Sequence, residues 1–97
     1  MNPTKSIQFV SASSYASKLP EGELRRLQAR FPARLVPVGA GVKVEVRECG
    51  EGPAIICLHG IGSGAASWLD VAERLASSAR VIAWDAPGYG HSTALIP

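Results

Sequence analysis

The sequence lacks most of the features that mark secreted, metal-binding or membrane-spanning proteins. It has two cysteines, Cys49 and Cys57, which make neither a disulfide framework nor a zinc-ligand spacing. No apolar run approaches the roughly 20 residues that span a bilayer, and no N-terminal apolar stretch is long enough for a signal peptide. We therefore expect a cytoplasmic protein with no metal and no membrane partner.

Charge of one sign is also scarce. Ten Lys and Arg residues against eight Asp and Glu give a net charge of +2, too small to indicate a nucleic-acid partner. The hydrophobic content of 46% is that of a globular protein. A chain of 97 residues is at most one small domain with a thin core.

The first third of the chain, residues 1–33, is predicted to be an extension with one short helix. Residues 1–19 are polar and serine-rich, without a period, and we expect them to be mostly unstructured. The stretch Pro20–Phe31 predicts a helix whose apolar side chains share one face: Leu24, Leu27 and Phe31. Such a helix covers a sheet, or alternatively docks a partner in a non-enzymatic interaction domain.

Two strands are predicted next, Arg34–Val38 and Val42–Glu48, joined through Gly39-Ala40-Gly41. Valines alternate with charged residues in the second strand, which predicts one buried face and one solvated face. Pro37 suits an edge strand, because proline cannot donate a hydrogen bond to a neighbouring strand.

The remaining pattern is strand, helix, strand. The stretch Ala54–Leu58 is apolar throughout, which is typical of a central strand. The helix is expected over Ser67–Ser78, with Ser67 and Asp70 forming a capping box, and Arg80–Trp84 is a second apolar strand. This order predicts an α/β fold in which the two strands pair in parallel.

A glycine-rich turn follows each of these apolar strands. Leu58-His59-Gly60-Ile61-Gly62 comes after the first, and Asp85-Ala86-Pro87-Gly88-Tyr89-Gly90-His91-Ser92 comes after the second. A strand that opens into a glycine-rich turn presents backbone N–H groups at the carboxyl edge of a sheet. Such donors can hold a negatively charged oxygen, which is what an oxyanion hole requires.

From about Arg34 to Ser92 the chain resembles the first half of an α/β-hydrolase. The hairpin, the strand ending in His-Gly, the helix, and the strand ending in Asp-x-Pro-Gly-x-Gly-x-Ser come in that family's order. The resemblance implies that residues 34–97 are the N-terminal part of an α/β-hydrolase domain, truncated before the nucleophile elbow. The nucleophile, base and acid would then lie outside this chain, which alone would be inactive.

The same resemblance implies roles for the first glycine turn. The backbone N–H of Ile61 would be an oxyanion-hole donor, with Gly62 as the second candidate, while His59 and Gly60 position the loop. Trp68 is a weaker candidate for the substrate pocket. The implied reaction is nucleophilic acyl transfer on a small-molecule ester, lactone or similar carbonyl substrate, without a cofactor.

A dinucleotide-binding oxidoreductase is the alternative. Gly60, Gly62 and Ala65 fit G-x-G-x-x-[G/A], and Asp85 lies twenty residues past Ala65, where such domains hold a ribose. The upstream hairpin and the extra loop before Ser67 count against this interpretation, because the fingerprint's last glycine belongs in the first helical turn.

One serine resembles a nucleophile without being in the right place. Gly90-His91-Ser92-Thr93-Ala94 has the spacing of a nucleophile elbow, but no strand leads directly into Ser92. We predict instead that Ser92 caps a following helix, and that Trp84 is a core aromatic residue.

Overall fold

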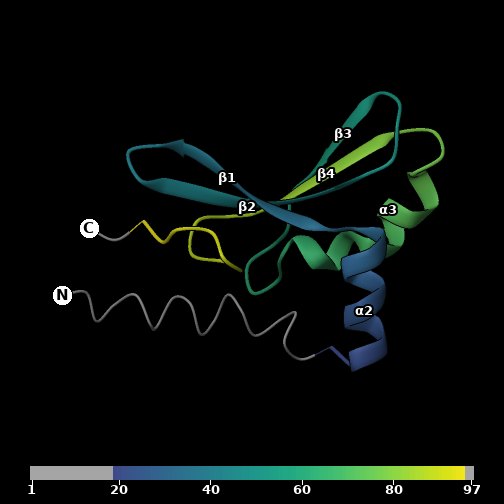
Figure 1. Cartoon of the computed structure of the whole chain (residues 1–97), viewed down its shortest axis with the longest axis horizontal. Helices are drawn as coiled ribbons and strands as arrows, with labels where there is room; N and C mark the ends of the chain where they lie inside the picture. The colour runs from purple at the N-terminus through teal and green to yellow at the C-terminus, as the bar shows by residue number, and fades with distance from the viewer. Residues whose placement is uncertain (1–18, 96–97) are drawn as a thin grey trace.

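A computed structural model of the chain describes residues 19–95, which form a four-stranded sheet with helices beside it (Figure 1). The predicted unstructured lead lies, apart from Leu19, outside the described residues. The elements in chain order are α2 (Glu21–Arg30), β1 (Ala33–Gly39), β2 (Val42–Cys49), β3 (Ala54–Cys57), the 3₁₀ turn η1 (Ala65–Trp68), α3 (Leu69–Leu75) and β4 (Arg80–Asp85).

The strand order is β1-β2-β4-β3. β1 and β2 form the predicted antiparallel hairpin, and β2 is also antiparallel to β4. β3 and β4 pair in parallel across the helical segment, which confirms the predicted α/β architecture. The tight turn between β1 and β2 needs glycine, because Gly39 and Gly41 have φ values of 107° and 75°, which side chains disfavour.

The core lies between one face of the sheet and the helices α2 and α3 (Figure 1). Leu27 and Phe31, from the predicted apolar face of α2, are completely buried, as are Val81 and Ala83 of β4. Cys57 is buried among them as a small hydrophobic side chain, as the sequence predicted.

The prediction that β2 has a solvated face is wrong. Glu45 and Arg47 are buried, because the alternation directs them to the sheet face that the helices cover. Arg47 Nη1 donates a hydrogen bond of 2.8 Å to the carbonyl oxygen of Phe31, at the end of α2. Arg47 therefore ties the sheet to the end of the helix, and Glu45 bonds to the segment after β4 instead of facing water.

The prediction that Ala54–Leu58 forms a central strand is also wrong for the described residues. β3 is at the edge of the sheet, and Ile56 and Leu58 are 61% and 65% exposed. The crossover places β3 outside β4, and within residues 19–95 no strand lies beyond it. An apolar strand sequence thus indicates that the strand can be buried on both faces. It does not show that residues 19–95 contain the neighbours that would bury it.

The helix after β3 begins differently from the prediction. α3 runs only over Leu69–Leu75 and is preceded by η1, so Ser67 is not its N-cap. The Ser67 hydroxyl donates a hydrogen bond of 2.7 Å to the carbonyl oxygen of Gly64. Ser67 and Asp70 therefore make no capping box.

Candidate active-site edge

The two glycine-rich segments lie side by side at the carboxyl edge of β3 and β4 (Figure 1). The backbone N–H of Ala86 donates a hydrogen bond of 3.0 Å to His59 Nε2. The backbone N–H of Gly62 donates one of 3.2 Å to the hydroxyl of Tyr89. The rings of His59 and Tyr89 lie between these bonds, with centroids 4.6 Å apart and planes at 56°. The first loop is therefore held against the second at two points.

His59 holds the loop through both ring nitrogens. Nε2 accepts from Ala86, so it carries no proton, and the proton is on Nδ1. Nδ1 lies 2.9 Å from the carbonyl oxygen of Gly60 and donates to it. This neutral imidazole links two backbone groups. Its contacts suit the predicted role of positioning the loop.

Ile61 and Gly62 occupy the corner of a tight turn. The N–H of Ser63 bonds to the carbonyl oxygen of Gly60 at 3.1 Å, and Gly62 has a φ of 80°, as in a type II turn. The Ile61 side chain is fully exposed, and its backbone N–H makes no hydrogen bond to any residue between 19 and 95. Ile61 thus presents a backbone donor at the sheet edge.

Asp85 anchors the segment that follows this turn. Its Oδ1 accepts a hydrogen bond of 2.8 Å from the N–H of Ala65, which begins η1. A Cβ atom at Gly64 would lie 3.0 Å from Asp85 Oδ1, and one at Gly90 would lie 2.5 Å from both Asp85 Oδ2 and Glu45 Oε1. The motif glycines are therefore needed for close approach to buried carboxyl groups, as expected for a structural turn.

The buried carboxyl groups of Asp85 and Glu45 have opposite pKa shifts. Burial raises the pKa of Asp85, and the neighbouring Glu45 raises it further. Burial also works to raise the pKa of Glu45, but the backbone N–H and ring of His91, together with Asp85, hold it below its usual value. Glu45 therefore ionises more readily than Asp85, and both carboxylates raise the pKa of the neighbouring Arg47 guanidinium against the lowering effect of burial.

The two tryptophans lie on different elements, η1 and β4. Trp68 ends η1 and packs partly buried against the core, with its indole N–H buried and without a hydrogen-bond partner in the described residues. Trp84, predicted to be a core residue, is only half-buried and is not part of the core cluster. Its side of β4 is opposite the helices.

Ser92 is not a helix cap, because no helix begins there within the described residues. Its side chain is completely buried, and its hydroxyl bonds to the backbone of β2 and β4. His91, next to it, places Nδ1 3.2 Å from Glu45 and not at Ser92. This arrangement supports the prediction that Ser92 is no nucleophile.

Sequence reasoning missed Tyr89 and Glu45. The sequence places Tyr89 in a turn, although an aromatic hydroxyl between two glycines can reach a neighbouring loop. Glu45 was placed on a solvated face. Its burial depends on the segment after β4, where Ser92 and His91 bond to it, and the strand pattern alone gives no signal for these contacts.

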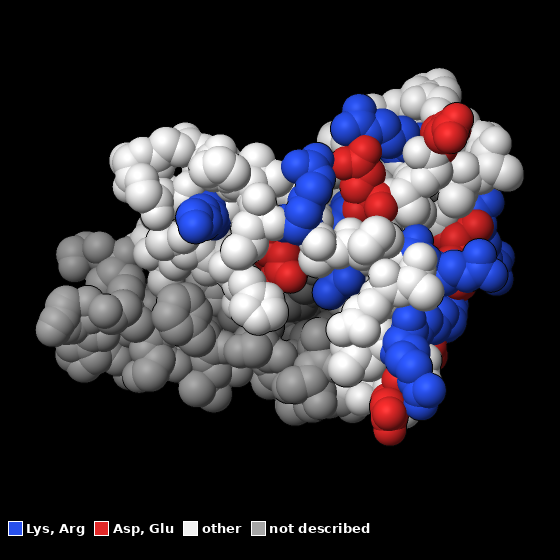
Figure 2. Space-filling view, viewed as in Figure 1, with Lys and Arg blue, Asp and Glu red and all other residues white. Residues whose placement is uncertain are grey.

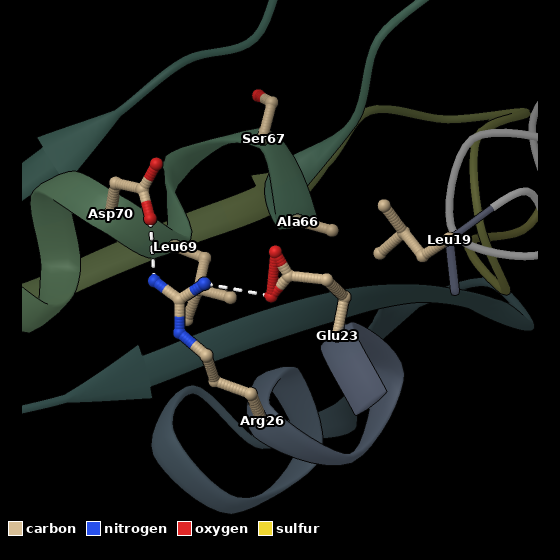
Figure 3. A pocket seen from close by; sticks show the side chains of 7 residues that line it. All are labelled: Leu19, Glu23, Arg26, Ala66, Ser67, Leu69 and Asp70. Atoms are coloured by element: carbon tan, nitrogen blue, oxygen red, sulfur yellow. Dashed lines mark hydrogen bonds and ion pairs between the residues drawn. The ribbon is translucent and has the colours of Figure 1, made fainter. Parts of the chain in front are cut away.

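Ion pairs connect α2, the predicted helix of the N-terminal extension, to α3. Arg26 points between the two helices and bonds to Glu23 at 2.7 Å and to Asp70 at 2.5 Å (Figure 3). A further bond of 2.5 Å reaches Glu73. A pocket of about 90 Å³ beside these side chains is thus lined by charges that already pair with one another. Because α2 buries its apolar face in the core, that face is not available to a partner.

Charges of both signs are mixed on the face that contains these helices (Figure 2). Arg34 and Arg80 likewise flank Glu48. No group of three or more potential metal ligands occurs in the described part of the chain. No helix among residues 19–95 is long and apolar enough to cross a membrane.

Comparison with known proteins identifies the fold. Residues 53–97 match the family model described as alpha/beta hydrolase fold. The structure resembles the crystal structure of an epoxide hydrolase from Vigna radiata, with a TM-score of 0.66 and 35% identity over 72% of this chain and 23% of that one. This chain has the N-terminal portion of an α/β-hydrolase fold.

Two curated hydrolases are similar to about half of this chain. A pimeloyl-[acyl-carrier protein] methyl ester esterase of Vibrio vulnificus is 48% identical over 46 residues, which are 47% of this chain and 18% of the esterase. An (E)-2-((N-methylformamido)methylene)succinate hydrolase of Acinetobacter baylyi is 42% identical over 48 residues, 50% of this chain and 18% of that enzyme. The chain spans about a fifth of the length of these relatives.

The dinucleotide-binding interpretation gains no support from these hydrolases. Asp85, which would hold the ribose in that interpretation, already has another partner. Its side chain is buried and accepts a hydrogen bond from the N–H of Ala65. A ribose would have to displace that bond. The glycine turn is therefore to be understood as part of an α/β-hydrolase fold.

Proposed function

We propose that this segment forms the oxyanion side of an active site in a longer hydrolase, which cleaves esters, lactones or similar carbonyl substrates by nucleophilic acyl transfer. The backbone N–H of Ile61 is the principal donor to the developing oxyanion, and Gly62 is the second. His59 and Gly60 position the turn. None of these residues is the nucleophile, which would come from the rest of the protein.

The accessible amide of Ile61 is the observation that carries this proposal. It is at the corner of a turn whose ends are fixed by Gly60 and Ser63, and His59 fixes the turn to the neighbouring strand end. A donor that is already in place stabilises charge without reorganising during the reaction, which is how oxyanion holes act.

We propose that residues 1–33 are an extension and residues 34–97 a partial domain, and the exposed β3 edge supports the second of these two points. Ile56 and Leu58 at this edge are apolar and exposed, and the relatives are about five times longer than the matched region. We propose that further strands of the parent protein continue the sheet beyond β3, and that the nucleophile, base and acid lie in that part. The present chain alone would then have no hydrolytic activity.

The substrate class rests on the relatives. Relatives named for a pimeloyl-[acyl-carrier protein] methyl ester and for a succinate derivative are both similar to this chain, which favours a carbonyl substrate and does not choose between them. Trp68 is a weaker candidate for a substrate contact, because part of its side chain packs against the core. We expect no cofactor. A cytoplasmic location agrees with the free thiols of Cys49 and Cys57.

The test is to remove one N–H while keeping the turn. Ile61→Pro in the full-length protein deletes the donor, and proline is favoured at the second position of a type II turn. Loss of one oxyanion donor should lower kcat for an activated ester by about 10²–10³-fold. Ile61→Ala is the matched control, since it removes the side chain and keeps the N–H. Its kcat should stay close to that of the unmodified protein.

Two results would contradict the proposal. If Ile61→Pro folds and retains kcat, the Ile61 amide does not stabilise the transition state. If the unmodified full-length protein hydrolyses no ester or lactone, the reaction class is wrong. Circular dichroism and the thermal midpoint of both variants distinguish a lost donor from a lost fold.

A further inference from the structure

Tyr89 has a contact that the proposed oxyanion role does not use. Its hydroxyl accepts a hydrogen bond from the N–H of Gly62, at 3.2 Å, and Gly62 is the second candidate donor. The phenol oxygen therefore occupies the place where a substrate oxygen would have to lie to receive that hydrogen bond. A backbone N–H has a single hydrogen, so the two oxygens compete for it.

The backbone of Tyr89 is fixed, whereas its side chain is only half-buried. Its N–H bonds to the carbonyl oxygen of Ala86 at 2.8 Å, and its own carbonyl oxygen accepts from Ser92 at 2.9 Å. The flanking glycines Gly88 and Gly90 adopt φ values of 87° and 53° that complete these turns. The hydroxyl is at the exposed end of a half-buried side chain. Rotation of the side chain could thus release Gly62 without unfolding the segment.

We propose that the Tyr89 hydroxyl is a stand-in for the substrate oxygen: it occupies the Gly62 donor in the substrate-free protein and leaves when substrate binds. This inference rests on the proposed oxyanion role of the turn. Tyr89 consequently determines how easily the site accepts a substrate. The free energy needed to break its hydrogen bond to Gly62 reduces the net free energy of substrate binding.

The ring and the hydroxyl of Tyr89 have separable effects. The ring packs against His59, which holds the loop, with centroids 4.6 Å apart. The hydroxyl alone competes for Gly62. Tyr89→Phe removes the competitor and keeps the ring, whereas Tyr89→Leu removes both and leaves His59 without its aromatic neighbour.

The experiment measures kcat and KM for an activated ester with the full-length protein and both variants. Because kcat/KM compares the transition state with the free enzyme, it contains the whole cost of displacing Tyr89. A neutral hydrogen bond of ordinary strength predicts that Tyr89→Phe raises kcat/KM about fivefold. Tyr89→Leu should lower kcat instead. Hydrogen exchange of the Gly62 amide should become faster in Tyr89→Phe.

Each result supports the inference or overturns it. If Tyr89→Phe leaves kcat/KM unchanged or lowers it, the hydroxyl does not compete with substrate. If Gly62 exchange is unchanged, the hydrogen bond is absent from the protein in solution and the inference is wrong. Ile61→Pro, measured alongside, separates the two proposals. When it lowers kcat but Tyr89→Phe has no effect, only the role of Tyr89 fails. When it has no effect, the oxyanion role fails and the inference fails with it.

Discussion

The hydroxyl of Ser92 accepts a hydrogen bond of 2.8 Å from the backbone N–H of Glu45, forty-seven positions earlier in the chain. The same hydroxyl donates to the carbonyl oxygen of Asp85, at 2.5 Å. Ser92 is completely buried, so water does not reach these groups. One serine therefore fixes the segment after β4 against β2, and indirectly fixes the turn that contains Tyr89.

We predict that Ser92→Ala is destabilising and leaves hydrolysis possible. The substitution leaves the N–H of Glu45 and the carbonyl oxygen of Asp85 without their partner, and each buried unpaired group costs about 1–3 kcal/mol. Urea denaturation of the full-length protein measures the loss in free energy of unfolding. Below the unfolding transition, the variant should still hydrolyse ester, because Ser92 is not the nucleophile.

Thr93→Ala is the matched control. The Thr93 hydroxyl oxygen also accepts a backbone N–H, that of Lys43 at 2.9 Å, but this bond is exposed and water replaces it. Its effect should stay within about 0.5 kcal/mol. Equal losses in the two variants would contradict the importance of burial at Ser92. A folded Ser92→Ala protein without any activity would contradict the prediction that hydrolysis survives the loss of this hydroxyl.

Local patterns in the sequence predicted most elements of the fold. The helix α2, the β1–β2 hairpin with its glycine turn, and the parallel pair β3 and β4 all lie close to their predicted positions. Apolar periodicity and glycine placement are local signals, and they were sufficient to predict these elements. The start of α3 was wrong, because Ser67 bonds backward to Gly64 instead of capping the helix.

What the sequence did not predict depends on contacts between distant segments. The burial of Glu45 and Arg47 arises from α2 and from the segment after β4, and neither is apparent in the alternation of β2. The exposed position of β3 depends on which strands lie beside it. For the candidate site, the glycine motif located the turn, but the pairing of Gly62 with Tyr89 joins residues that are twenty-seven positions apart.

Gly50, in the turn before β3, has two reasons to be glycine. A side chain there would clash with nearby backbone atoms, and the backbone has a positive φ. Its φ is 87°, and a Cβ atom there would lie 2.1 Å from the carbonyl oxygen of Ala79 and 2.8 Å from the Cα atom of Ala76. Gly41 has a similar φ of 75° with nothing within 4 Å. Both alanine variants suffer the left-handed strain of about 1–2 kcal/mol.

We predict that Gly50→Ala destabilises the protein more than Gly41→Ala by at least about 2 kcal/mol, because only the former meets backbone atoms that cannot rotate away. Chemical denaturation of both variants gives the difference. Similar losses would mean that the turn before β3 relaxes, and that Gly50 is needed for its φ alone.

The stability of the protein should depend on the ionisation of Glu48. A hydrogen bond from Arg80, and a second from Arg34 at 3.2 Å, outweigh the effect of burial and hold the pKa of Glu48 below its usual value of 4.5. A carboxyl group with a lowered folded-state pKa stabilises the protein above its unfolded pKa, and this stabilisation is lost as the pH falls through the folded value. Glu48→Gln, which cannot ionise, should lack this pH dependence.

The measurement is the free energy of unfolding of the unmodified protein and of Glu48→Gln, from about pH 6 down to about pH 2. We expect the unmodified protein to be the more stable above pH 4.5 and the difference to disappear at the acid end. The pair is exposed, so the difference should be small and should shrink in about 1 M NaCl. Glu51→Gln is the control, because Glu51 is exposed and forms no ion pair within residues 19–95. An equal pH dependence in both variants would mean that the ionisation of Glu48 does not contribute to stability.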